Sequence, residues 1–183
     1  GGTFTLNYPS YINSLTLNSA STVNGTSAFQ FWQSTGNAIA CNVDSVIASG
    51  VRINDNNVTF NTAAGTTLTI TGPLTNFNGN TSNSATKSGF TKTGTGTLLL
   101  GGANNYGGNT TVSAGTLKLG GSSALGGTTY GTSVSSGAVL DLNGKAIGAE
   151  SLTLSGTGIS SGGALVNTSG TPASLSGAVS LAT

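Results

Sequence analysis

The sequence predicts an all-β fold: a solenoid of about nine coils, formed by one domain spanning residues 1–183. Three observations support this prediction. Apolar residues alternate with Thr, Ser or Asn in short runs, which is the period of a β-strand. The clearest runs recur about every twenty residues, a spacing that favours stacked coils over the hairpins of a sandwich. Only 5% of the residues are charged and 30 are glycine, which is unusual for an ordinary globular domain.

Residues 1–88 are expected to form irregular coils of this solenoid. Successive side chains of a strand point to opposite faces, so two apolar residues that flank a polar one are expected to face inward. Such pairs are Phe4 and Leu6, Leu15 and Leu17, Phe29 and Phe31, Val51 and Ile53, Val58 and Phe60, and Leu68 and Ile70. Cys41 lies in a run of the same kind. Because the chain has no His to act as a base, we expect Cys41 to be a small buried residue and not a reactive thiol.

Residues 89–183 are expected to form the more regular coils. Leu98 and Leu117 are 19 residues apart, Leu117 and Leu140 are 23 apart, and a weaker strand at Val112 or Val134 separates each pair. The apolar pairs that flank a polar or half-polar position here are Leu98 and Leu100, Leu117 and Leu119, Leu140 and Leu142, Leu152 and Leu154, and Val179 and Leu181. The alternation places Leu100, Leu117, Leu119, Leu140 and Leu142 in the core, and Thr69, Lys118, Asp141 and Thr153 in solvent.

One segment, residues 89–119, carries a longer motif of glycines, leucines and a turn between two strands. The residues that fit it are Lys92, Gly94, Gly96, Leu98, Leu100, Gly102, Asn104 or Asn105, Tyr106, Gly108, Thr110 or Thr111, Val112, Gly115 and Leu117. The segment resembles the autotransporter-associated β-strand repeat of bacterial surface passengers. The resemblance implies that each repeat is one coil of a right-handed parallel β-helix that is exported to the cell surface. It implies no substrate.

The sequence offers little for catalysis or for charged partners. The basic residues form no stripe, so nucleic-acid binding is not expected, and no apolar run is long enough to span a membrane. Asp141 and Glu150 are close in sequence and could project from neighbouring coils, but we expect both to be solvated surface acids. Asn54–Asn57 is expected to be a turn and not a calcium loop. The prediction is therefore no enzyme, with no catalytic, cofactor-binding or metal-binding residues and no cofactor.

The function that we expect is structural and extracellular: a β-helical stalk or filament subunit, secreted or on a bacterial surface. Neither end carries a recognisable cap, and few charges oppose self-association, so the expected partners are copies of the chain stacked head to tail. Alternatively, adjoining coils of a longer passenger cover the ends. The Gly-Gly start without Met indicates a processed product or an excised piece.

A second hypothesis is an adhesin that recognises a glycan or another surface through one flank of the β-helix. Trp32 falls outside the inward Phe29 and Phe31 positions, and Tyr8 and Tyr11 lie in the same N-terminal region. Exposed aromatic rings can stack on a sugar or on a partner. Trp32, Tyr8 and Tyr11 are therefore the candidate partner-contact residues.

Overall fold

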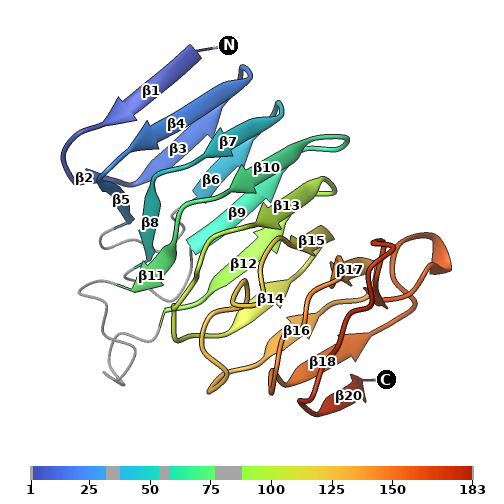
Figure 1. The fold of residues 1–183 in the computed structure, drawn as a ribbon. Helices are drawn as coiled ribbons and strands as arrows, with labels where there is room; N and C mark the ends of the chain where they lie inside the picture. Colours follow the sequence, from blue (N-terminus) through green and yellow to red (C-terminus); the bar gives the residue numbers. More distant parts are fainter. Residues whose placement is uncertain (1, 32–37, 54–57, 77–87, 183) are drawn as a thin grey trace.

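The computed structural model describes residues 2–31, 38–53, 58–76 and 88–182. Its strands stack in coils from one end of the molecule to the other, and the two chain ends lie at opposite ends of the stack (Figure 1). Three parallel sheets form the sides of the solenoid, and we call them A, B and C. Among the described residues, the one helical segment is a single 3-10 turn, Ile159–Ser161 (η2).

Two sheets run the whole length of the stack, and the third is short. Sheet A contains β1 (Gly2–Leu6), β4 (Ser21–Gly25), β7 (Ser45–Ile47), β10 (Thr67–Ile70), β13 (Thr97–Leu100), β15 (Gly115–Leu119), β17 (Ala138–Asp141) and β19 (Leu165–Val166). Sheet B contains β2 (Ser10–Ile12), β5 (Ala28–Phe31), β8 (Gly50–Ile53) and β11 (Leu74–Asn76). Sheet C contains β3 (Ser14–Leu17), β6 (Ala38–Cys41), β9 (Val58–Thr62), β12 (Phe90–Thr93), β14 (Thr110–Val112), β16 (Thr132–Val134), β18 (Leu152–Ser155) and β20 (Val179–Ala182).

The parallel solenoid predicted from the spacing of the leucines is confirmed. Leu98 pairs with Leu117 and Leu117 with Leu140, all in parallel register, while Val112 pairs with Val134 on sheet C. In the described residues each long sheet has eight strands, and seven steps separate the first strand from the last. The stack therefore has about seven turns, where nine were expected. The estimate of twenty residues per coil was too low, since Ile70 pairs with Leu100, thirty residues later. At about 4.8 Å per strand, the stack is roughly 34 Å long.

The two halves of the solenoid differ in the number of strands per coil. In the described residues, sheet B consists of β2, β5, β8 and β11, so the coils of the N-terminal half have three strands. Within residues 88–182, each coil has one strand in sheet A and one in sheet C, and the third side is a turn or loop. The segment 101–109 is one such loop, and its two glycine pairs and three asparagines favour turns over strand. The regular coils of the C-terminal half are therefore two-stranded.

Side chains from successive coils form rows that run through the core. On sheet A, one row contains Val23, Ile47, Ile70, Leu100 and Leu119, all buried. The five predicted core leucines are confirmed, since Leu100, Leu117, Leu119 and Leu140 are fully buried and Leu142 is 7% exposed. The buried position predicted for Cys41 is confirmed as well. A single hydrophobic cluster extends from Leu6 to Ala164.

The predicted exposure of two acidic residues is wrong. Asp141 and Glu150 were expected in solvent, but each is only 2% exposed. Asp141 does occupy the outer row of sheet A, in register with Lys118, yet the chain after β19 covers it through Thr168. Glu150 lies just before β18. Its carboxyl group is inside the coil, where it accepts a hydrogen bond from the Thr132 hydroxyl. Lys118 and Thr153 lie outside, as expected.

Two glycines allow a matched test of how closely the coils approach each other. Gly94 and Gly65 have nearly the same left-handed backbone angle, φ +70° and +71°. A Cβ on Gly94 would collide with the backbone carbonyl of Thr62 on the neighbouring coil, whereas a Cβ on Gly65 would meet nothing within 4 Å. We expect Gly65→Ala to cost about 1 kcal/mol of unfolding free energy, from backbone strain alone.

Gly94→Ala is expected to cost clearly more than Gly65→Ala, because the coils must also separate. Chemical denaturation of the two variants measures the difference. Equal costs would show that the coils at Gly94 are not packed backbone to backbone.

Candidate functional site

Each end of the solenoid presents core positions that no further coil covers. Phe4 continues the inward row of Val23, but it is 58% exposed because β1 is the first strand of sheet A. At the other end, Leu181 continues the inward row of Leu154 on sheet C and is 80% exposed. Val179 is 46% exposed for the same reason. The exposure of these apolar side chains therefore reflects where the stack stops, not a change in the strand pattern.

The strands at these ends also have unpaired edges. Within the described residues, β1 pairs only with β4, β3 only with β6, and β20 only with β18. At the N-terminal end, the uncovered core opens as an apolar groove of about 420 Å³. Its apolar lining consists of Phe4, Ile12, Leu15, Leu17, Val23 and Phe29. Free N–H and C=O groups beside an apolar floor are the features that pair with another strand. We call the two ends of the stack, each with its free strand edges and uncovered core side chains, the end surfaces.

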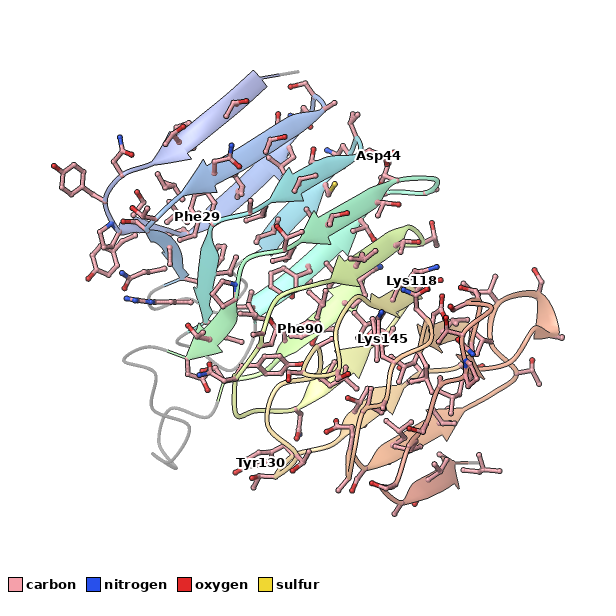
Figure 2. All side chains as sticks on the ribbon, in the orientation of Figure 1. Phe29, Asp44, Phe90, Lys118, Tyr130 and Lys145 are labelled. Atoms are coloured by element: carbon pink, nitrogen blue, oxygen red, sulfur yellow. The ribbon has the colours of Figure 1, made fainter. Side chains whose placement is uncertain are left out.

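The predicted partner-contact residues divide into two groups. Tyr8 is 81% exposed and Tyr11 is 63% exposed, so both rings are on the surface of the first coil. Tyr11 lies on the outer face of sheet B, in a row with Gln30, Arg52 and Thr75. Trp32 lies outside the described residues. Figure 2 shows Phe29, the neighbour of Gln30 on β5, toward the N-terminal coils, well separated from Lys118 and Lys145.

Lys92 of the repeat motif is fully buried in an inward row of sheet C, between Phe60 and Val112. Its ammonium group donates hydrogen bonds to the backbone carbonyls of Thr93 (2.7 Å), Gly94 (2.8 Å) and Ala114 (3.2 Å). Three N–H donors therefore meet three carbonyl acceptors at the corner where the coil turns. Alternation alone indicates the inward orientation of Lys92, because it follows Phe90 by two residues.

We expect Lys92 to make stability depend on pH in the alkaline range. Burial lowers the pKa of Lys92 to about 8, below its ordinary value of 10.5. Between these values the unfolded chain binds more protons than the folded chain, so the free energy of unfolding should rise with pH from about 8 to 10. Lys92→Met should abolish this rise. Urea denaturation at several pH values measures the effect, and a rise that persists in Lys92→Met would show that another group is responsible.

Asp141 is the centre of a polar cluster that fixes the loop after β19. Its Oδ1 atom accepts hydrogen bonds from the backbone N–H groups of Asn143 (2.9 Å) and Thr168 (3.0 Å). Its Oδ2 atom accepts one from the Thr168 hydroxyl (2.6 Å) and lies 3.3 Å from Lys118 Nζ. Burial alone would raise the pKa of Asp141, but the hydrogen bonds from Thr168, Asn143 and Lys118 together lower it below its usual range. This cluster therefore holds the loop after β19 against the outer face of sheet A.

A second buried polar cluster lies inside the C-terminal coils. The hydroxyls of Tyr106 and Thr110 are 2.6 Å apart, and Thr132, which pairs with Thr110, donates to Glu150 Oε1 (2.8 Å). Burial raises the pKa of Glu150, and it raises that of Tyr106 as well, with the nearby Glu150 contributing. Both groups are therefore neutral over a wider pH range than in water. Sequence reasoning missed this cluster because Tyr106 and Thr110 fitted the repeat motif as turn and strand residues.

The described residues contain no group of three or more His, Cys, Asp or Glu side chains that lie together. None of the helical segments in the described part of the chain has the length and apolar character needed to span a membrane. The calcium-loop alternative at Asn54–Asn57 lies outside the described residues. The features that bear on function are therefore the two end surfaces and the outer face with the exposed tyrosines.

Comparison with known families supports the motif. The family model described as the passenger-associated-transport-repeat matches residues 90–119. This segment contains β12 to β15, so the repeat covers strands of sheets A and C in two successive coils, and not the single coil that the resemblance implied. No curated protein and no solved structure matched the chain. The resemblance noted over residues 89–119 is thereby confirmed, and a passenger repeat within a β-solenoid fits a surface or secreted protein of the passenger type.

Proposed function

We propose that this chain is a non-catalytic structural element, a β-solenoid stalk of a passenger-type protein, and that its two end surfaces bind further coils. The observation that carries the proposal is that sheets A and C both extend to both ends of the stack. Each end therefore offers two free strand edges, one from sheet A and one from sheet C, and in each sheet the edge strand runs parallel to the others. Uncovered core side chains, such as Phe4 and Leu181, lie beside these edges. A β-helical coil fits such an end because it continues both sheets at once.

The two end surfaces are suited to each other. Leu181 ends the inward row of sheet C at the C-terminal coil, and Leu15 begins the same row at the N-terminal coil. A second copy placed on the stack would bring these two leucines into adjacent rungs. Such contact is heterologous and does not close on itself, so it extends into a filament. Adjoining coils of a longer polypeptide would occupy the same surfaces in the same way.

Concentration-dependent association tests the proposal. The purified chain should form elongated oligomers as its concentration rises, which light scattering and negative-stain imaging detect. Leu181→Lys and Phe4→Lys should each keep the chain monomeric, because a charge on an edge strand opposes strand pairing. Ser133→Lys is the matched control, since Ser133 is exposed on the outer face of β16, and β18 and β20 lie between it and the C-terminal edge of sheet C. A chain that stays monomeric at high concentration would contradict the proposal.

A second candidate function is adhesion through one flank of the first coils. The specific observation that favours it is the exposure of Tyr8 and Tyr11, at 81% and 63%. Aromatic rings on a rigid sheet can stack on sugars at little cost in conformational entropy. Stalk and adhesin roles are compatible, because the end surfaces and the outer face of sheet B are different parts of the molecule.

A further inference from the structure

A polar groove of about 340 Å³ lies along the outer side of sheet B, in the N-terminal half of the stack. Its volume is at the lower end of the range of ligand sites, about 300–1,000 Å³. Pro9 and Pro73 are among the lining residues, and Thr26, Ser27 and Thr75 line it with hydroxyl groups. The groove is thus walled by rigid backbone and has hydrogen-bonding side chains.

Of the described residues that line this groove, Arg52 is the one that is charged. It lies on β8, half-buried on the outer face between Gln30 and Thr75. No acidic side chain of the described residues forms an ion pair with it, whereas Lys118 is paired with Asp141. Lys92 is fully buried, and its ammonium group donates to three backbone carbonyls. The groove therefore presents a guanidinium group whose charge lacks a counter-charge in the part of the chain that the structure describes.

Gln30, the neighbour of Arg52 in the outer row, has an unsatisfied polar atom. Its side chain is 2% exposed, and its Oε1 atom is buried without a hydrogen-bond donor among the described residues. A buried acceptor without a donor costs free energy, but Gln30 is not among the residues that line the groove, so its Oε1 atom is no direct contact for a ligand there. On the other side of Gln30 in the row is Tyr11, and Tyr8 precedes Pro9 of the groove wall.

We propose that the Arg52 groove binds a sugar that bears a carboxylate, as a segment of an acidic polysaccharide. The planar guanidinium fork matches a carboxylate through two parallel hydrogen bonds, and its charge, which no acidic side chain of the described residues balances, selects an anion. Thr26, Ser27 and Thr75 provide partners for sugar hydroxyls, and the exposed tyrosine rings extend the contact beyond the groove. The proposal rests on the adhesin candidate and is independent of the end surfaces, so its failure would leave the stalk function intact.

Titration calorimetry with two acidic oligosaccharides, trigalacturonate and sialyllactose, tests this assignment. We expect at least one of them to bind with a dissociation constant of about 1 mM or lower. Its neutral counterpart, the methyl ester of trigalacturonate or plain lactose, should bind at least tenfold more weakly. Arg52→Ala should abolish binding, and Arg52→Lys should weaken it several-fold because an ammonium cannot form the paired hydrogen bonds.

The control variant is Lys145→Ala, which removes one positive charge in the C-terminal half of the stack (Figure 2) and should bind as the unaltered chain does. Circular dichroism of each variant confirms that it is folded. Failure of both acidic sugars to bind would overturn the proposal, as would equal binding by folded Arg52→Ala. Competition by inorganic phosphate as effective as the sugar itself would also overturn it, because the groove would then be a simple anion site.

Discussion

Leu119→Ala should lower the free energy of unfolding by about 2–5 kcal/mol, because it removes a fully buried side chain and leaves a cavity in the core. Leu119 lies in an inward row that begins at Phe4 and contains Val23, Ile47, Ile70 and Leu100. The rungs above and below are held by parallel backbone pairing, so they cannot close onto the lost volume. Urea denaturation followed by circular dichroism measures the change.

The matched control for this prediction is Leu99→Ala in the adjacent coil. Leu99 has the same side chain and the same sheet, but it points outward and is only partly buried. We expect the loss to be less than about 1 kcal/mol, as for substitutions away from the core. Similar losses in the two variants would show that the assignment of inward and outward faces on sheet A is incorrect.

Asp141→Ala should be the most destabilising change on the outer face, at about 3 kcal/mol, since hydrogen bonds to a buried charge each contribute roughly 1.5–3 kcal/mol. The substitution leaves the N–H groups of Asn143 and Thr168 without their acceptor. The loop that Thr168 anchors should therefore detach first. Hydrogen exchange at Thr168 reports this detachment, and thermal unfolding reports the overall loss.

The same carboxylate makes the fold sensitive to acid. Its pKa is lowered in the folded chain, so its contribution to stability is present above the unfolded value, about 3.9, and is lost as pH falls below it. Asp141→Asn should remove most of this acid dependence while keeping the side-chain shape. An unchanged acid transition in Asp141→Asn would assign the dependence to other groups.

The fold could be predicted from the sequence because, in a solenoid, the same pattern of alternating apolar residues recurs from coil to coil. The alternation at Leu117 and Leu119 sets the inward face, and the interval to Leu140 sets the stacking partner. The number of coils could not be derived in the same way, since loop lengths vary where no strand constrains them. The interval from Ile70 to Leu100 contains eleven more residues than the interval from Leu100 to Leu119.

The buried acids were missed because alternation predicts the direction of a side chain and not what lies above it. Asp141 points outward as predicted, but a loop 27 residues later in the chain covers it. One local signal was available: an Asp followed two residues later by Asn favours an Asx turn, in which the carboxylate accepts a backbone N–H. The Arg52 groove had no such signal, because it forms only when four coils stack side by side.

Both the stalk function and the groove depend on the chain being a rod of parallel coils in register. Pairs of spin labels along the outer row Thr59, Thr91, Thr111, Ser133, Thr153 and Ser180 test this arrangement most directly. In a Cys41→Ala background, the distances from Thr59 should increase steadily, by about 4.8 Å for each strand, to roughly 24 Å at Ser180. Distances that fail to increase along the row, as in a sandwich of antiparallel strands, would contradict the account.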